Sequence, residues 1–214
     1  MKKLFWNILD KKRLETFKEL YTIFGNDYYL AGGTALALQI GHRESLDFDL
    51  FRDKEITFAV KRKMLAGFIK RSPKMLVDTA DELTLTVEHA VKITVLNYFW
   101  GPVFPLIKVP GSLSLLSIKD IAATKAYALG RRGNYRDYFD LYVIIKNRQA
   151  SLREIVKISK KKYGDVFSER MFLEQLLFTK ELEIDGHLRY LAEKAVSPNT
   201  LAGFFKRRII DEGF

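Results

Sequence analysis

The amino-acid sequence predicts an α+β fold, α/β-like at its start, with a small β-sheet, flanking helices and a helical C-terminal part. Three observations support this prediction. Strand-like patterns fall within residues 28–98, helical spacing dominates after residue 117, and residues 99–112 between them hold three prolines and two glycines. With 214 residues and 48% hydrophobic content, the chain can bury a substantial core. We expect an α/β domain over residues 1–115 and a helical domain over residues 116–214.

The first half of the chain alternates between helical and extended patterns. A turn at Gly32 and Gly33 precedes a short helix that Thr34 is expected to cap through its side-chain oxygen. The helices expected in this half are residues 10–24, 34–40 and 56–71. The expected strands are residues 28–31, 46–51, 74–78, 82–88 and 91–98. We expect the last two strands to form a hairpin around His89 and Ala90.

The second half reads as a series of helices. Ser117 followed three residues later by Asp120 resembles a capping box, which marks the start of the first helix. The expected helices are residues 118–130, 136–147, 151–163, 168–180, 186–195 and 198–208.

Composition excludes several classes of function. The chain has no cysteine, which excludes a disulfide scaffold or a thiolate metal site, and three histidines without HExxH argue against a zinc hydrolase. No apolar run is long enough for a transmembrane helix, so we expect no membrane contact and a cytoplasmic location. A net charge of +10 favours a polyanionic partner such as nucleic acid, although basic helices also serve solubility alone.

Two aspartates interrupt a strand that is otherwise apolar. In the stretch LDFDL, residues 46–50, side chains two apart share a face, so Asp47 and Asp49 point one way and their apolar neighbours point the other. Neighbouring carboxylates repel each other unless a positive charge lies between them. A hard divalent cation such as Mg²⁺ meets this need and keeps coordination positions for phosphate oxygens. The alternative is a solvated strand edge with salt bridges.

The glycine pair supplies a second element of the same site. A strand, a turn at Gly32 and Gly33 and a helix N-terminus bring free backbone N–H groups together, and glycine lets a phosphate approach the backbone. No GxxxxGK[ST] sequence occurs, so this is not a P-loop. A phosphate seat beside metal-binding carboxylates favours phosphoryl or nucleotidyl transfer from a nucleoside triphosphate.

Three segments together resemble a known family. They are LAGGTALALQIGHRESLDFDLF (residues 30–51), VKITVLNYFWGPVF (residues 91–104) and SIKDIAATKAYALGRRGNYRDYFDLYVII (residues 117–145). In this order they resemble the AbiEii/AbiGii-type toxins, nucleotidyltransferase-like proteins of the DNA polymerase β superfamily. The resemblance implies a small mixed sheet at the core and covers residues 28 to 147.

The resemblance also implies roles for individual residues. Gly32, Gly33 and Thr34 match the turn that grips phosphate, and Asp47 and Asp49 match the metal-binding pair. Lys125 matches a helix lysine that holds the triphosphate. Asp137 matches a further catalytic or positioning carboxylate, and Asp140 matches the second acid of the same segment.

The residues themselves leave alternatives open for several of these roles. Lys125 lies in an apolar stretch, so its charge needs a partner, which is either a phosphate or a nearby aspartate. Asp137 and Asp140 share a helix face, where they can also serve the helix dipole and pair with Arg131, Arg132 or Arg136. Arg43, just before the aspartate strand, has the geometry to bind a phosphate in a bidentate manner and is a further candidate for nucleotide binding.

One feature departs from the superfamily pattern. Many polymerase-β-like enzymes carry a third acid on the next core strand, where it activates the attacking hydroxyl, but residues 91–95 read VKITV. The AbiEii-type family commonly lacks this acid. Glu82, Glu88 and Asp137 are the candidates that could replace it.

The resulting hypothesis is a nucleotidyltransferase dependent on Mg²⁺, or on Mn²⁺, that moves a nucleotide from an NTP to a hydroxyl of RNA, with tRNA as the favoured acceptor. As a toxin it would have a cognate antitoxin protein. One alternative is a catalytically weakened module that binds nucleotide or RNA for regulation, as the missing strand acid suggests. Another is a nucleotidyltransferase with a protein or small-molecule acceptor.

Overall fold

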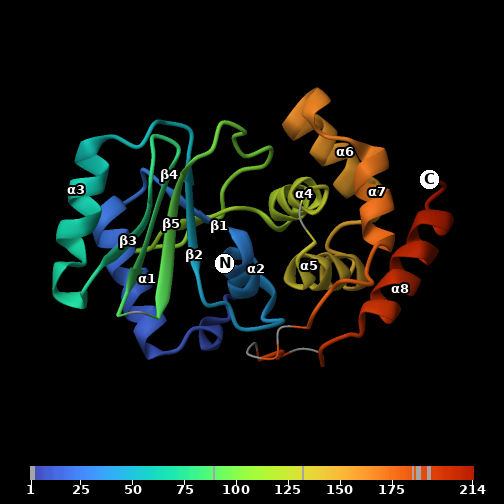
Figure 1. Cartoon of the computed structure of the whole chain (residues 1–214), viewed down its shortest axis with the longest axis horizontal. Coiled ribbons are helices and arrows are strands. Elements are labelled where there is room, and N and C mark those ends of the chain that lie inside the picture. The colour runs from blue at the N-terminus through green and yellow to red at the C-terminus, as the bar shows by residue number, and fades with distance from the viewer. Residues whose placement is uncertain (1–2, 89, 132, 185, 187–188, 192–193) are drawn as a thin grey trace. The chain divides into compact units, whose positions relative to one another are not determined.

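The computed structural model describes the chain except for residues 1–2, 89, 132, 185, 187–188 and 192–193. Its contacts divide it into two compact units (Figure 1). Unit 1 comprises Met1–Gly101 and Pro105–Leu116, and unit 2 comprises Pro102–Phe104 and Ser117–Phe214. Among the described helices, none has both the length and the apolar composition that a bilayer crossing requires.

Unit 1 contains a mixed six-stranded sheet, which confirms the predicted fold class. Its strands are β1 (Tyr29–Ala31), β2 (Phe48–Arg52), β3 (Lys74–Asp78), β4 (Glu82–Val87), β5 (Val91–Asn97) and β6 (Ser114–Leu115). The order across the sheet is β3-β4-β5-β2-β1-β6, with β2 parallel to β5, β1 parallel to β6 and the other neighbours antiparallel. The β4–β5 pairing confirms the expected hairpin strands, while His89 lies outside the described residues.

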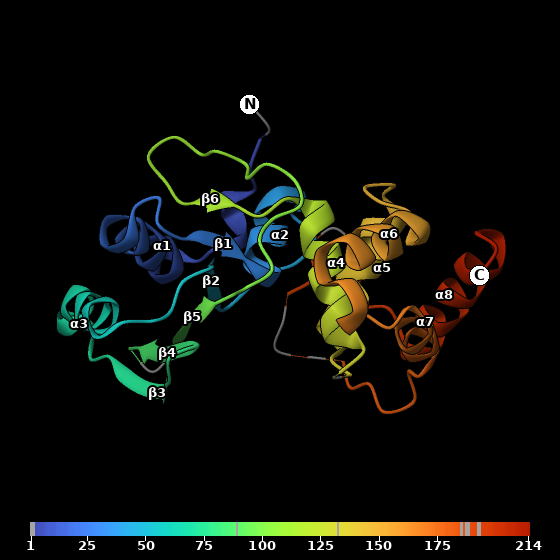
Figure 2. The same cartoon turned by 90° about the horizontal axis from the view of Figure 1, so that it is seen from above.

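The helices of unit 1 lie on both sides of this sheet. They are η1 (Trp6–Ile8), α1 (Lys11–Phe24), α2 (Gly32–Ile40), α3 (Phe58–Gly67) and η2 (Ile69–Arg71). In the view from above, α1 and α3 lie on one side and α2 on the other (Figure 2). The helix expected over residues 56–71 is shorter than predicted, because α3 ends at Gly67 and a separate 3-10 turn follows.

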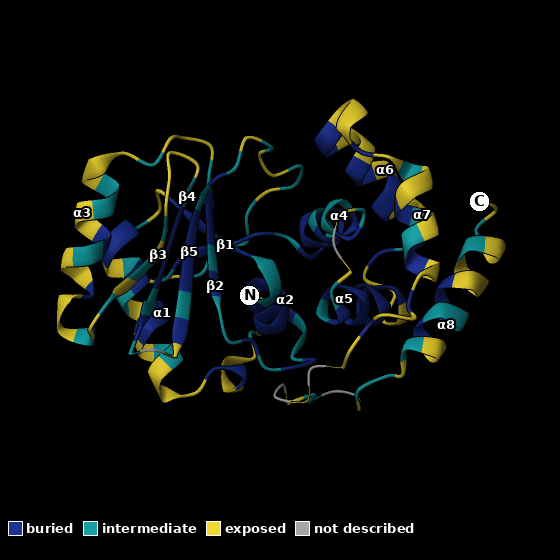
Figure 3. Cartoon of the chain, in the orientation of Figure 1, coloured by how far each residue is buried: buried dark blue, intermediate teal, exposed yellow. Residues whose placement is uncertain are grey.

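The two faces of the sheet differ sharply in polarity. Phe48 and Leu50 of β2 and their apolar neighbours on β4 and β5 are fully buried, and Phe17 of α1 stacks on Phe48 with ring centroids 5.9 Å apart. Figure 3 shows this burial through the central strands, with the outer faces of α1 and α3 exposed. The register places Asp49 and Thr94 side by side on the opposite face, and Thr94 beside Thr84. At the centre of the sheet, the apolar side chains of β2, β4 and β5 therefore gather on one face, and Asp49, Thr94 and Thr84 lie on the other.

Unit 2 is helical, and its α-helices begin within one residue of the predicted positions. The helices are α4 (Ile118–Leu129), α5 (Tyr135–Lys146), α6 (Leu152–Tyr163), η3 (Gly164–Val166), α7 (Glu169–Leu177) and α8 (Pro198–Asp211). Ser117 caps α4 by accepting from the Asp120 N–H at 3.0 Å, and Ser151 with Glu154 forms a full capping box on α6. The largest fully buried side chains of this unit are Tyr138, Phe139, Phe172 and Phe205.

One expected helix was wrong, and one strand was missed. The helix expected over residues 186–195 is absent from its described residues, Gly186, 189–191 and 194–195. Tyr190 instead packs edge-on against Phe139 with ring centroids 4.9 Å apart, so tertiary packing outweighs the local helical pattern. Residues 187–188 and 192–193 of that expected helix lie outside the described part of the chain. The strand β6 was missed, because two residues are too few to show periodicity.

Candidate functional site

The glycine turn and the aspartate strand come together at the start of α2. Ala31, the last residue of β1, pairs with Asp49 of β2, and Gly32 follows immediately with a φ of +63°. A Cβ atom on Gly32 would lie 2.1 Å from the Asp49 Oδ2 atom. Glycine is therefore required here for two reasons, the left-handed backbone and the carboxylate that lies against it.

The second glycine brings a positive charge to the same turn. A Cβ atom on Gly33 would lie 2.7 Å from Nη2 of Arg43, so the guanidinium packs directly on the backbone of this residue. Arg43 is 2% exposed, and its Nη1 donates to the Glu44 carbonyl oxygen at 2.9 Å. The buried cation adds to the positive potential that the first N–H groups of α2 create, which makes this turn attractive to an anion. The nucleotide-binding role of Arg43 stays a prediction.

Thr34 does not cap the helix as expected. The helix α2 already begins at Gly32, its N-cap is Ala31, and no side chain caps it. The Thr34 hydroxyl instead donates a very short hydrogen bond to the Asp47 carbonyl oxygen and lies 2.7 Å from the Ser45 hydroxyl. Because α2 begins two residues before Thr34, this residue lies within the first turn of the helix, and its hydroxyl fixes the segment that leads into β2.

Asp47 lies just before β2 and faces a lysine that the sequence analysis overlooked. The distance between Lys92 Nζ and Asp47 Oδ2 is 3.6 Å, and the Asp47 side chain is 30% exposed. Because β2 and β5 are parallel with Asp49 beside Thr94, Lys92 lies two residues before Thr94, on the same face as Asp47. β2 ends at Arg52 and β5 begins at Val91, so only the pairing of these two strands reveals this neighbour.

The pair Asp47 and Asp49 has the donor chemistry of a site for a hard divalent cation. Within the described part of the chain, no group of three or more His, Cys, Asp or Glu residues is placed to hold a metal ion. Two carboxylates beside an anion-attracting turn fit Mg²⁺, which usually binds through one or two carboxylates, substrate phosphates and water. The Lys92 ammonium beside Asp47 is also the salt bridge that the alternative interpretation of this strand expects, and the metal-binding role of Asp47 and Asp49 stays a prediction.

Lys125 and Asp137 belong to unit 2, where they form a buried ionic cluster. The Lys125 ammonium lies 2.7 Å from Asp137 Oδ1 and 2.6 Å from Asp140 Oδ2, and the three side chains are 8%, 7% and 0% exposed. Asp140, for which we considered an arginine partner, therefore pairs with Lys125. Of the two partners considered for Lys125, the structure contains the aspartate. A role of Lys125 or Asp137 toward a nucleotide stays a prediction.

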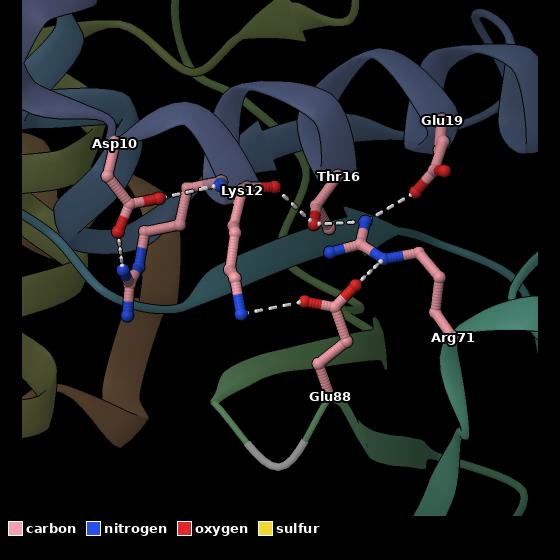
Figure 4. A network of polar contacts seen from close by, with 7 residues as sticks. Asp10, Lys12, Thr16, Glu19, Arg71 and Glu88 are labelled. Atoms are coloured by element: carbon pink, nitrogen blue, oxygen red, sulfur yellow. Dashed lines mark hydrogen bonds and ion pairs between the residues drawn. The ribbon is translucent and has the colours of Figure 1, made fainter.

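Glu88, one candidate for the missing strand acid, forms ion pairs with Arg71 and Lys12 (Figure 4). Its Oε1 accepts from Arg71 Nε at 2.8 Å, and its Oε2 lies 3.3 Å from Lys12 Nζ. Arg71 in turn bonds Thr16 at 2.7 Å and Glu19 at 2.6 Å, so the network ties the end of β4 to α1. The hydrogen bond from Arg71, followed by that from Lys12, lowers the pKa of Glu88, which makes it a weak base.

Comparisons with known proteins identify the family of the chain. Residues 20–199 match the family model of the nucleotidyl transferase AbiEii toxin of type IV toxin–antitoxin systems. An uncharacterized protein of Aquifex aeolicus strain VF5 is 32% identical over 167 residues, which cover 74% of this chain and 77% of that protein.

Two solved structures share the fold. MenT4, a nucleotidyltransferase toxin of Mycobacterium tuberculosis H37Rv, aligns with a TM-score of 0.61 at 16% identity, over 94% of this chain and 82% of that one. A putative nucleotidyltransferase of Helicobacter pylori aligns with a TM-score of 0.54 at 16% identity, over 96% of this chain and all of that one.

Proposed function

The chain belongs to the AbiEii nucleotidyltransferase toxin family, and from this premise we propose that it moves a nucleotide from an NTP to a hydroxyl of RNA, with tRNA as the acceptor. Membership in this family makes it a nucleotidyltransferase of a toxin–antitoxin system, with a nucleotide as substrate and an antitoxin as partner. The identity of the acceptor, the metal and a cytoplasmic location are part of the proposal.

The triphosphate would bind at the N-terminus of α2. The first N–H groups of a helix have no partner within the helix, and glycine at positions 32 and 33 lets phosphate oxygens approach them. Arg43, packed on Gly33, would strengthen the attraction without leaving the protein interior. Bound Mg²⁺, or Mn²⁺, held by Asp47 and Asp49 would neutralise the charge of the phosphate oxygens.

The reaction proposed is a displacement at the α-phosphorus. The acceptor oxygen forms a bond to the α-phosphorus, the bond from that phosphorus to the β-phosphate oxygen breaks, and pyrophosphate leaves with the electron pair. The proton of the acceptor hydroxyl passes to a base. The protein contributes mainly by positioning and by charge, as is usual for transfer of phosphorus-containing groups.

RNA is the acceptor that the charge of the chain favours. A net charge of +10 attracts a polyanion, because lysine and arginine side chains displace counterions from phosphates. A small neutral or cationic acceptor would gain nothing from this excess.

The observation that carries the proposal is the Asp49 carboxylate lying on the Gly32 backbone at the start of α2. The test incubates the purified chain with Mg²⁺, each radiolabelled NTP in turn and total tRNA, alongside Asp47→Ala as the matched variant. We expect label on RNA with the wild-type chain and not with the variant. Absence of transfer with every NTP, or equal transfer by both proteins, would refute it.

A regulatory module that binds nucleotide without turnover is the second candidate. Thr94, not an acid, stands beside Asp49 on β5, and this observation favours a weakened centre. Under this alternative, an NTP with Mg²⁺ raises the melting temperature of the protein while no label reaches any RNA. Label transfer excludes this alternative.

A further inference from the structure

The polar face of the sheet contains a chain of side chains that begins beside Asp49. Thr94 of β5 is the direct neighbour of Asp49 in the parallel pairing, and Thr84 of β4 is the direct neighbour of Thr94 in the antiparallel pairing. Directly paired residues point to the same face of a sheet. Glu82, two residues before Thr84, shares that face as well. Thr94 and Thr84 are 8% and 4% exposed, so little water competes for their hydroxyl groups.

Hydrogen-bond distances link these three side chains in series, with Thr84 in the middle. The Thr84 hydroxyl donates to Glu82 Oε1 at 2.7 Å, and the hydroxyl oxygens of Thr84 and Thr94 are 3.2 Å apart. A hydroxyl has one proton, and an ionised carboxylate can only accept. The Thr84 hydroxyl is oriented to donate to Thr94 as well as to Glu82, but its one proton favours the nearer carboxylate. With that proton on Glu82, the Thr84 oxygen can accept from the Thr94 hydroxyl once the latter rotates toward it. The Thr94 oxygen, next to Asp49, is then left as an acceptor.

The other two acids considered as a general base already form ion pairs with basic side chains. Glu88 is held by Arg71 and Lys12, and Asp137 is held by Lys125. Within the described residues, the Glu82 carboxylate takes part in no ion pair and accepts one hydrogen bond, from the Thr84 hydroxyl. Glu82 is therefore the candidate whose carboxylate is connected to the neighbourhood of Asp49.

We propose that Thr94, Thr84 and Glu82 form a proton relay that accepts the proton of the attacking hydroxyl. This inference rests on the proposed nucleotidyl transfer. As the acceptor oxygen bonds to the α-phosphorus, its proton moves to the Thr94 oxygen, the Thr94 proton moves to Thr84, and the Thr84 proton moves to the Glu82 carboxylate. Pyrophosphate leaves with the electron pair of the broken bond, so charge and protons balance. Thr94 touches the reacting hydroxyl, and Glu82 acts through the two threonines.

The test compares substitutions that remove or keep one hydroxyl. Thr94→Val removes it, and Thr94→Ser keeps it at the same position. Glu82→Gln removes the final proton acceptor. Thr86→Val is the matched control, because Thr86 lies on the same strand and face, beside Lys92, but outside the relay. For each protein, we would measure kcat and KM for transfer of labelled nucleotide to RNA, and the shift in melting temperature caused by NTP with Mn²⁺.

The relay predicts a specific pattern of results. Thr94→Val and Glu82→Gln lower kcat by about a hundredfold, within the range of general-base contributions, while KM for the NTP stays within about twofold. Thr94→Ser restores most of the rate, and Thr86→Val behaves as the wild-type chain. All four variants keep the stabilisation by NTP and Mn²⁺, because the relay does not bind the nucleotide.

Other results overturn the relay in distinguishable ways. If the wild-type chain transfers no nucleotide, the proposed function fails and the relay fails with it. If the wild-type chain transfers nucleotide and Thr94→Val and Glu82→Gln do so at the same rate, the relay alone fails. A Thr94→Val protein that loses the stabilisation by NTP and Mn²⁺ also refutes the relay, because Thr94 then serves binding.

Discussion

The two units hold their carboxylates in opposite ways. In unit 1, the Asp47 side chain is 30% exposed and the Lys92 ammonium lies 3.6 Å away. In unit 2, Asp137 and Asp140 are 7% and 0% exposed and share the Lys125 ammonium at 2.7 and 2.6 Å. Asp47 is accessible to a ligand, whereas Asp137 and Asp140 are paired with a cation inside the fold. The same residue type is thus partly exposed beside one lysine in unit 1 and paired inside the core in unit 2.

A second buried pair in unit 2 follows the architectural pattern. Lys162 Nζ lies 3.2 Å from Asp120 Oδ1, with side chains 1% and 0% exposed. Asp120 also accepts from the backbone N–H groups of Val103 and Phe104 at 2.8 and 3.1 Å. Burial lowers the pKa of Lys162, and the nearby Asp120 opposes this effect. This carboxylate fixes the segment before α4 to the rest of its unit.

The largest effect is expected where the backbone itself shapes the site. Gly32→Ala places a Cβ 2.1 Å from Asp49 Oδ2, so the carboxylate must move, and transfer should fall by about a hundredfold or more. Gly111→Ala is the control, because Gly111 has a similar φ of +65° and no atom within 4 Å of the added Cβ. Both variants should lose some stability through backbone strain, but only Gly32→Ala should lose transfer. Equal transfer by the two variants would separate Gly32 from the site.

The next effect tests the buried cluster of unit 2. Lys125→Met removes the ammonium that lies against two buried carboxylates, which should lower the free energy of unfolding by about 3–5 kcal/mol. Lys119→Met, on the same helix, removes a lysine that is 40% exposed and pairs with Glu154 at 2.8 Å, and should cost less than about 1 kcal/mol. Urea denaturation measures both. A similar small loss for both variants would contradict an architectural role for Lys125.

A smaller effect on stability is expected for the lysine of unit 1. Lys92→Met breaks a pair whose side chains are 45% and 30% exposed, so the free energy of unfolding should change by less than about 1 kcal/mol. Without this cation, the repulsion between the carboxylates rises, and the protein should depend more on divalent cation for stability. Melting temperatures with and without Mn²⁺ measure this dependence. A loss as large as that of Lys125→Met would remove the contrast between the units.

The smallest expected effect is on the stability that Glu88 contributes at low pH. The pKa of Glu88 is lowered by Arg71 and Lys12, so its pairing stabilises the fold above the ordinary glutamate pKa, about 4.3, and this contribution disappears as the pH falls through the lowered value. Glu88→Gln lacks the contribution at every pH. The difference in unfolding free energy between the two proteins should therefore shrink between pH 6 and pH 3, roughly across the range where glutamate is protonated. A constant difference would show that the pairing does not depend on the charge of Glu88.

The local part of the site could be predicted from the sequence, and the long-range part could not. Gly32 and Asp49 meet because β1, α2 and β2 follow one another within residues 29–52, so their order alone brings them together. Lys92 and Thr94 join them only because β5 pairs with β2, which no local pattern encodes.

The same distinction explains the secondary structure. Periodicity and capping residues predicted the helices from α4 to α8, because these signals are local. These local signals failed for residues 186–195, where Tyr190 packs on α5. They also failed for β6, whose two residues form a strand only by pairing with β1. The pairing of Lys125 with Asp137 and Asp140 was one of two open alternatives, because sequence shows the need for a counter-charge but not its source.

The most direct test of the proposed site is a crystal structure of the chain with Mg²⁺ and a non-hydrolysable NTP analogue. The account predicts metal density about 2.1 Å from oxygens of both Asp47 and Asp49, with the triphosphate at the backbone N–H groups of Gly33 and the start of α2. A nucleotide bound elsewhere, or a metal that leaves both aspartates without contact, would contradict the assignment of this face of unit 1 as the site of nucleotidyl transfer.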